Sequence, residues 1–451
     1  MNTFLGLGLG HNNKRITISA NVNINALFFA DDGALLALNN NDARYLLRIC
    51  ERWSRYYGLV FSPTKCAVLV KAIINDNLTL YNETLPEVTN FNYLGIDINR
   101  NGINTDACVE KRSRNARSKI FWLKSVGMNS YGWRTGSAVR VYKTFVRPMM
   151  EYGLALLIYP EKYIQLLQKI QNIALRIIAG GSRSTSISAL HTLLAVEYMK
   201  DRNEVLNMKY FSNIITNKHQ QLVWHIVSDT VDLIQRNKHV PAKSLIKQFI
   251  QKNRWGKLLV DDPGSFPDDK ELLVLRLQTL QQRQEAGTNA AHLLPPISHY
   301  RGYKIVLDSR NIDRSRMRAL LHWKLGRFSN GQPCSQCGIM NSPSHAIRCS
   351  KAYLKLIRLC RRYKYQRVIQ TRFGTMNIVD SMLWQIESKK SLYWKVIAEV
   401  SDIIINMQIL ILGYQATTAV TYSDDEDPNE KLNQDLRKAF SKSTKSRRQT
   451  R

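Results

Sequence analysis

Apolar and polar positions alternate near the N-terminus and then give way to a continuous apolar run. Apolar residues occupy even positions between Ile16 and Ile24, a period of two that predicts a strand. The segment 26–30 is apolar throughout, as in a strand buried on both faces. Asp31-Asp32-Gly33 is typical of a turn, and 34–38 predicts a second strand. The pattern therefore predicts a β-hairpin with two carboxylates at its tip.

Further elements of both kinds follow this hairpin. Polar capping residues at 39–42 precede apolar positions at helical spacing up to Gly58, and 61–70 and 91–96 have the composition of strands. From Glu110 onward the helical period prevails. It is clearest after Pro160, where the apolar stripe ends at Gly180-Gly181. We therefore expect an α+β fold, with mixed strands and helix first and mainly helices afterwards.

The chain is strongly basic. Its 451 residues contain 65 Lys and Arg against 35 Asp and Glu, a net charge of +30. Such an excess argues against an ordinary metabolic enzyme and favours a polyanionic partner, nucleic acid before an anionic membrane. Two blocks lack acidic residues altogether: 111–150 with ten Lys or Arg, and 314–379 with fourteen. We call them the first and second acid-free blocks. A solvated surface is the simple alternative, but interleaved Trp and Tyr residues favour nucleic-acid contact.

Five short motifs, in order, resemble those of reverse transcriptases. Phe28-Phe29-Ala30-Asp31-Asp32 resembles the Asp-Asp box in its non-LTR (LINE-type) retrotransposon form, although an Asp-Gly pair is also common in ordinary hairpin turns. The other four motifs are Phe61–Cys66, Phe91–Gly95, Lys143–Pro148 with Tyr152-Gly153, and Gln168–Gln171 with Ala174-Leu175-Arg176. The resemblance covers residues 15–200. It implies a partial palm, a thumb and RNA-directed DNA polymerase chemistry, in which Mg²⁺ ions held by aspartates act on the primer and the leaving pyrophosphate.

The resemblance also implies roles for individual residues. Asp31 would be the metal-ligating aspartate, Asp32 its companion, and Lys65 the cation beside the phosphates of the incoming dNTP. Tyr93-Leu94-Gly95 would form the primer grip, and Lys143, Arg147 and Arg176 of the thumb would contact nucleic acid. The family uses a further aspartate before this box, whereas residues 1–30 contain no Asp or Glu. We therefore expect a truncated enzyme that is inactive alone unless another chain completes the palm.

Four potential zinc ligands lie within sixteen residues near the C-terminus. Cys334-x2-Cys337-x7-His345-x3-Cys349 supplies a tetrahedral set, and Gly338 allows a tight turn. The segment resembles the Cys-Cys-His-Cys region after the polymerase of many non-LTR elements, which a basic stretch also precedes. Here that stretch contains the predicted nucleic-acid contacts Arg316, Arg318, Trp323 and Arg327. The alternative is three unrelated cysteines and a surface histidine. We expect structural Zn²⁺, with no open position for catalysis.

These observations predict six segments. They are a partial palm (1–110), a thumb-like helical domain (111–182), a helical connection (183–300), a basic zinc module (301–375), C-terminal helices (376–420) and a disordered tail (421–451). The leading hypothesis is a reverse-transcriptase fragment. The alternative is a non-catalytic protein that binds RNA or DNA, and a third possibility is a product without function. We expect RNA or DNA as partners, no membrane segment and no secretion, and hence a nuclear or cytoplasmic location.

Overall fold

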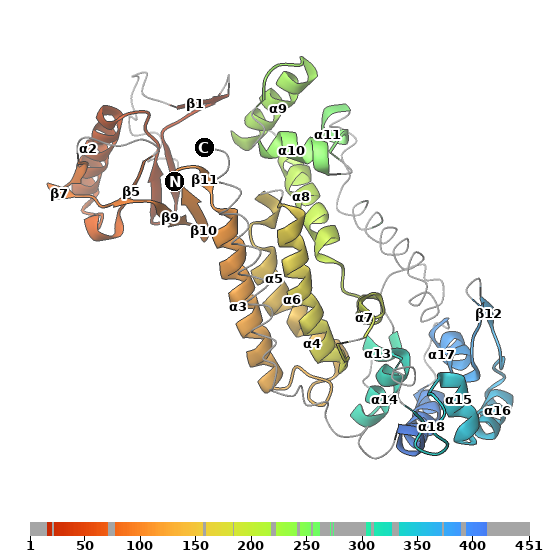
Figure 1. Cartoon of the computed structure of the whole chain (residues 1–451). Coiled ribbons are helices and arrows are strands. Elements are labelled where there is room, and N and C mark those ends of the chain that lie inside the picture. The colour runs from red at the N-terminus through yellow and green to blue at the C-terminus, as the bar shows by residue number, and fades with distance from the viewer. Residues whose placement is uncertain are drawn as a thin grey trace. The chain divides into compact units, whose positions relative to one another are not determined.

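The computed structural model describes residues 16–19, 22–70, 77–156, 159–183, 185–217, 222–240, 244–253, 256–261, 271, 274, 304–307, 311–326, 333–371, 374–388 and 394–412. The chain forms two compact units (Figure 1). The first contains Met1–Lys111, Ala155–Tyr159 and Asn207–Phe266, and the second contains Arg112–Leu154, Pro160–Leu206 and Pro267–Arg451. Helices and small sheets occur together, so the expected α+β class is confirmed.

The first unit begins with small antiparallel sheets beside helix α2 (Asn40–Tyr57). Strands β3 (Ala26–Phe29) and β4 (Asp32–Leu35) form the predicted hairpin. The side chain of Asn39 caps α2 by accepting a hydrogen bond from Asp42 N at 2.9 Å. The preceding pair is β1 (Ile16–Ser19) and β2 (Val22–Ile24).

One face of the β3–β4 hairpin is exposed, which corrects the expectation of a strand buried on both faces. Ala26 packs against Leu46 of α2, with Phe28 alongside. Leu27 and Phe29 point the other way and are 42% and 59% exposed. A two-stranded hairpin that packs on one helix buries only alternate residues.

The remaining strands of this unit are short. The segment 61–70 is not one strand, because Pro63 begins a 3₁₀ turn, η1 (Pro63–Lys65), and only β5 (Val68–Leu69) follows it. β5 pairs in parallel with β8 (Glu87–Val88), and β6 (Thr79–Leu80) pairs with β7 (Glu83–Thr84). The three-stranded sheet has the order β11 (Gly102–Ile103), β10 (Ile96–Asn99), β9 (Asn90–Tyr93). Later helices of the unit are α9 (Leu222–Gln235), α10 (Leu245–Lys252) and α11 (Leu258–Asp261).

The second unit begins with a group of helices. Helix α6 (Glu161–Ala179) confirms the prediction made from Pro160 and Gly180, and Gly180 ends it with φ +68°. The elements around it are α4 (Thr135–Val141), the π-helical turn η2 (Tyr142–Val146), α5 (Arg147–Glu151) and α7 (Ile187–Leu194). Helices α3 (Thr105–Ser125) and α8 (Met199–Thr216) each belong partly to this unit and partly to the first. Within this unit, Tyr142 donates its hydroxyl to Gln171 Oε1 at 2.7 Å, and Gln171 Nε2 donates to Glu197 O at 2.8 Å. The first of these bonds ties the π turn to α6.

A nearly buried ion cluster reinforces this group. Arg202 donates to both carboxylate oxygens of Glu151, at 2.7 and 2.9 Å. Arg147 lies 3.3 Å from Glu151 and 3.8 Å from Glu197. Burial lowers the pKa of Arg147, against the opposing effect of Glu151.

The C-terminal part of the second unit surrounds helix α18 (Trp394–Leu412). Helices α14 (Arg314–Lys324), α15 (Pro343–Cys349) and α16 (Ala352–Tyr363) all pack against it. Arg316 of α14 forms a two-pronged ion pair with Asp402 of α18, at 2.8 and 2.9 Å. The other elements are α13 (Lys304–Leu307), β12 (Gln370–Thr371), β13 (Gly374–Thr375) and α17 (Ile378–Ser388). Within the described ranges, every helix is too short or too polar to span a bilayer.

Candidate metal centre

Four side chains of the C-terminal module converge on one point. The ligand atoms of Cys334, Cys337, His345 and Cys349 all lie within 4.8 Å of one another. The Sγ of Cys349 is 3.7 Å from that of Cys334 and 3.8 Å from that of Cys337. The Sγ of Cys337 is 3.4 Å from Nε2 of His345. All the cysteines are free thiols, because these separations far exceed a disulfide bond.

These separations fit tetrahedral zinc. A zinc ion with Zn–S bonds of about 2.3 Å places two sulfurs about 3.8 Å apart at the tetrahedral angle. With a Zn–N bond of about 2.0–2.1 Å, a sulfur and a nitrogen lie about 3.5 Å apart. The three measured distances agree with these values to within about 0.2 Å. The donors therefore suit a structural metal, and all four tetrahedral positions are supplied by the protein.

The backbone brings the four ligands together through a tight turn and one helix. Cys334 N donates to Ile339 O and Gly338 N donates to Cys334 O, each at 2.8 Å, and Gly338 has φ +70°. These bonds fold the Cys334–Cys337 segment into a knuckle. His345 and Cys349 stand four residues apart, on the same face of α15. Ser342 caps that helix by accepting a hydrogen bond from His345 N at 3.0 Å.

The pKa values of the thiols in the cluster differ. Burial alone would raise the pKa of Cys334, but hydrogen bonds from His345 and from the backbone of Gln336 and Cys337 outweigh it, and the pKa falls to about 6. Burial, hydrogen bonds to the other two thiols and their charges raise the pKa of Cys349 to about 11. A bound cation would deprotonate all three thiols and offset the repulsion between the thiolates, so this donor set suits a metal.

The knuckle is anchored to the end of α18. Ser335 donates its backbone N–H to Ile411 O at 3.0 Å and its hydroxyl to Leu410 O at 2.7 Å. Carbonyls in the last turn of a helix lack partners within it, so Ser335 caps α18. The metal centre thereby connects the knuckle, α15 and α18.

Helix α16 begins three residues after the last ligand and, together with its N-cap residue Lys351, carries a basic face. Lys351, Lys355, Arg358 and Arg361 are exposed, whereas Leu356, like Ala352 and Cys360, is buried. At 100° per residue, Lys355, Arg358 and Arg361 span about 120° of the helix, and Lys351 is its N-cap residue. None of them forms an ion pair with another described residue. We call these four residues the α16 basic face. These four residues were not among the predicted nucleic-acid contacts, although their spacing is visible in the sequence.

The predicted catalytic carboxylates lie at the tip of the β3–β4 hairpin. Phe29 pairs with Asp32, so Ala30 and Asp31 form the turn, one residue earlier than predicted. Ala30 has φ +52°, and both aspartates are exposed. Among the described residues, the groups of three or more possible metal ligands are confined to the Cys/His cluster. The pair Asp31 and Asp32 therefore has no third ligand within that part of the chain, and Mg²⁺ binding by the pair alone has no support.

The other residues implied by the resemblance lie elsewhere in the first unit. Lys65 is exposed in η1. Tyr93-Leu94-Gly95 does form a hairpin, because Tyr93 pairs with Ile96 across the turn between β9 and β10. Leu94 and Gly95 have φ +49° and +75°, as a two-residue hairpin turn of this type requires. Their action on a primer stays a prediction.

The predicted thumb contacts all bond within the second unit. Lys143 Nζ donates to Ala195 O at 2.6 Å, and Arg176 Nη2 donates to Arg183 O at 3.3 Å. Arg147 belongs to the ion cluster with Glu151 and Glu197. Contact of these three residues with nucleic acid stays a prediction.

The residues predicted in the basic stretch differ in exposure. Trp323 is 4% exposed and donates its indole N–H to Asp380 at 3.2 Å. Arg316 is engaged with Asp402. The guanidinium of Arg318 lies 4.4 Å from the centre of the Tyr131 ring. Arg327 and the tail 421–451 lie outside the described residues.

No protein-family model and no curated protein matches the sequence. The metal centre, the basic surfaces and the ordered motifs are therefore the features that indicate a function.

Proposed function

We propose that this chain binds RNA or DNA and is of the non-LTR reverse-transcriptase type. The observation that carries the binding proposal is the α16 basic face next to the metal centre. Its four cations have no acidic partner in the described part of the chain. Lysine and arginine in such a row neutralise successive phosphates and release their counterions, which drives association. The metal ligands fix the helix that precedes the face and so help to orient it.

The reverse-transcriptase type is supported by motif order and local geometry together. Five motifs occur in the family's order. The Asp-Asp motif lies at a hairpin tip, and the Tyr-Leu-Gly motif forms a second hairpin turn. Hairpin tips expose functional side chains while the strands hold their direction.

RNA-directed DNA polymerisation is the second candidate, favoured by the exposed carboxylates of Asp31 and Asp32. Carboxylate oxygens suit Mg²⁺, which in polymerases activates the primer 3′-hydroxyl and stabilises the leaving pyrophosphate. The pair lacks a third ligand among the described residues, so polymerisation requires a further carboxylate from another segment or chain. We therefore expect binding, and no primer extension, from this chain by itself.

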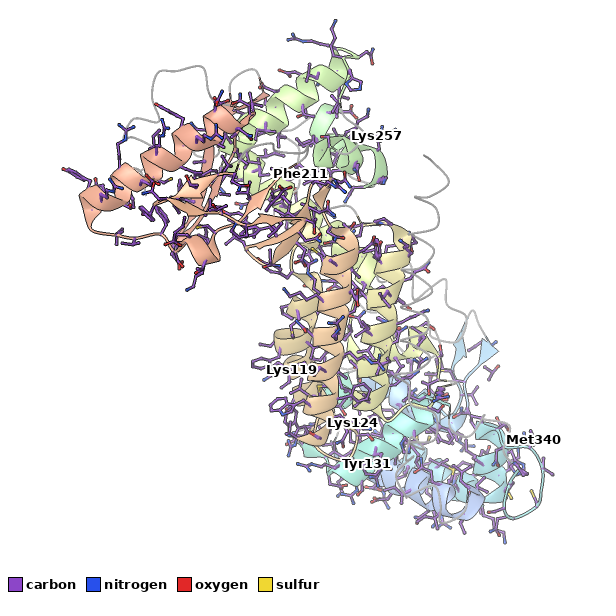
Figure 2. All side chains as sticks on the ribbon, turned by 60° about the vertical axis from the view of Figure 1, so that its left-hand side comes forward. Lys119, Lys124, Tyr131, Phe211, Lys257 and Met340 are labelled. Atoms are coloured by element: carbon purple, nitrogen blue, oxygen red, sulfur yellow. The ribbon has the colours of Figure 1, made fainter. Side chains whose placement is uncertain are left out.

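The binding proposal is tested by fluorescence anisotropy with a labelled RNA oligonucleotide and a DNA duplex, at several salt concentrations. We expect the triple variant Lys355→Ala, Arg358→Ala, Arg361→Ala to lower the log–log salt slope by about 2 to 3, since each lost phosphate contact removes about 0.7–0.9. The control removes three exposed cations of the first unit, Arg236, Lys238 and Lys257 (the last labelled in Figure 2). A chain that binds neither probe, or a salt slope near zero, contradicts the proposal.

The polymerase candidate has its own test. Purified protein is incubated with a primed RNA template, dNTPs and Mg²⁺ or Mn²⁺. Extension that disappears in Asp31→Asn would establish polymerisation and contradict our expectation of binding alone. In the absence of extension, Asp31→Asn with Asp32→Asn should leave RNA affinity unchanged or slightly higher, because both substitutions remove negative charge.

A further inference from the structure

The two acid-free blocks meet in space, although they lie far apart in the sequence. A small hollow is lined by Ser130, Trp133, Arg134 and Thr135 from the first block and by Arg314, Met317, Arg318 and Leu321 from the second, together with Ile312. The first group leads into α4, and the second belongs to α14. Both groups belong to the second unit. Three arginines thus converge on one hollow, and the lining includes no acidic residue.

Close packing fixes this junction. A Cβ at Gly136 of α4 would lie 2.1 Å from the carbonyl oxygen of Leu307 in α13, so only glycine allows this approach. A Cβ at Gly180 would lie 2.7 Å from Ser130 Oγ. Figure 2 shows Tyr131 just beyond Lys124 of α3. The guanidinium of Arg318 in α14 lies over the Tyr131 ring, 4.4 Å from its centre. The stacked ring holds one of the three guanidinium groups in place.

Within the described part of the chain, no acidic residue pairs with the three arginines at this hollow. Asp313, the acidic residue directly before Arg314 in the sequence, pairs with Arg316 at 3.0 Å. Arg316 also binds Asp402. Arg134, Arg314 and Arg318 form no ion pair with another described residue. Like charges that converge without an acidic partner repel one another, and an anion at the hollow removes that repulsion.

We propose that this hollow, which we call the arginine junction, binds a phosphate of the nucleic-acid backbone. The inference rests on the proposed function and adds a second contact site to the α16 basic face. All three cations are arginines, whose planar fork can bind two phosphate oxygens at once. The hydroxyls of Ser130 and Thr135 provide further donors. The hollow is small, so the phosphate lies at its mouth, and contact is independent of base sequence.

The test compares the full-length chain with the triple variant Arg134→Ala, Arg314→Ala, Arg318→Ala. The probes are a single-stranded RNA and a DNA duplex of equal length, each in two unrelated sequences. Loss of the one phosphate contact lowers the salt slope by about 0.7–0.9, so wild-type affinity should fall about 3-fold more than variant affinity between 50 and 200 mM salt. The same loss is expected for both sequences of each probe. The matched control is again Arg236→Ala, Lys238→Ala, Lys257→Ala.

Two further measurements guard against a folding defect. The variant Arg134→Lys, Arg314→Lys, Arg318→Lys keeps the charge, so it should retain most of the salt slope while losing two-pronged binding. Photo-crosslinking of 4-thiouridine RNA to the unmodified chain should label peptides 130–135 and 314–321. The proposal is overturned if the alanine variant matches the control and crosslinks fall elsewhere. If the chain still binds RNA in that case, the proposed function survives; if it binds neither probe, both fail.

Discussion

Replacing Cys337 by serine removes one corner of the metal centre while changing a single exposed atom. The sulfur–sulfur separations of 3.7 and 3.8 Å fix the size of the site. The centre of a regular tetrahedron lies about 0.61 edge lengths from each corner, which gives a metal–sulfur distance of about 2.3 Å, the Zn–S value. We therefore expect one zinc per chain in the unmodified protein, with three sulfurs and one nitrogen around it.

Metal analysis of natively purified protein measures the zinc content per chain. X-ray absorption spectroscopy measures the ligand types and the Zn–S distance. Cys337→Ser should lose the zinc or hold it weakly, since the alcohol does not ionise as a thiol does. Protease sensitivity between 333 and 349 should then rise, because the knuckle is no longer held. The control is Cys360→Ala, which removes a buried thiol of the same module that is not a ligand. Metal-free native protein, or zinc held equally well by Cys337→Ser, would contradict a zinc site built from these four ligands.

Three further outcomes test the packing. Burial, with smaller effects of Cys66 and Glu51, raises the pKa of the Cys50 thiol from about 9 to about 11. Between these values only the unfolded state loses the proton, so stability should fall by about 2–3 kcal/mol as pH rises from 9 to 11, measured by denaturation, and Cys50→Ala should flatten that slope. Gly136→Ala should destabilise the chain by about 1–3 kcal/mol, because its Cβ overlaps a carbonyl oxygen. Glu151→Gln should cost about 3 kcal/mol, the lower end for breaking a buried pair, because Arg202 is nearly buried and keeps only the 3.7 Å pair with Glu197.

Matched substitutions separate these effects from general perturbation. Ser137→Ala lies in the same helix as Gly136 but is exposed, and we expect less than about 0.5 kcal/mol from it. Glu161→Gln breaks an exposed pair with Lys200 at 3.9 Å, which is worth at most about 1 kcal/mol. If Glu151→Gln costs no more than Glu161→Gln, burial does not strengthen the first pair. If Gly136→Ala destabilises the chain no more than Ser137→Ala, then α13 moves freely to make room for the added Cβ.

Features set by local spacing could be predicted from the sequence. The Cys/His cluster needs only four ligands within sixteen residues, and its convergence follows from a knuckle and one helical turn. Helix 161–179 was delimited by Pro160 and Gly180, and the Asp-Gly turn gave the first hairpin to within one residue. In each case the determining contacts lie close together along the chain.

Features that depend on distant segments could not be predicted. Phe29 lies in an apolar run, but its exposure depends on which face of the hairpin meets α2. Trp323 stands in a basic stretch, yet Asp380, more than fifty residues later, holds its ring inside the module. The arginine junction is the clearest case, because no periodicity relates residue 134 to residue 314. Sequence patterns identified both basic blocks, and only the fold brings them together.

The bonds from Ser335 to the end of α18 have a consequence for the order of synthesis. The four ligands occupy a short segment and can bind zinc soon after leaving the ribosome. Their anchor, Leu410 and Ile411, is made about sixty residues after the last ligand, Cys349. At about 5–20 residues per second, a nascent chain that binds zinc at once would carry a loaded but undocked knuckle for several seconds. A ribosome stalled before residue 410 would thus present a metal-bearing segment whose supporting helix has not yet been made.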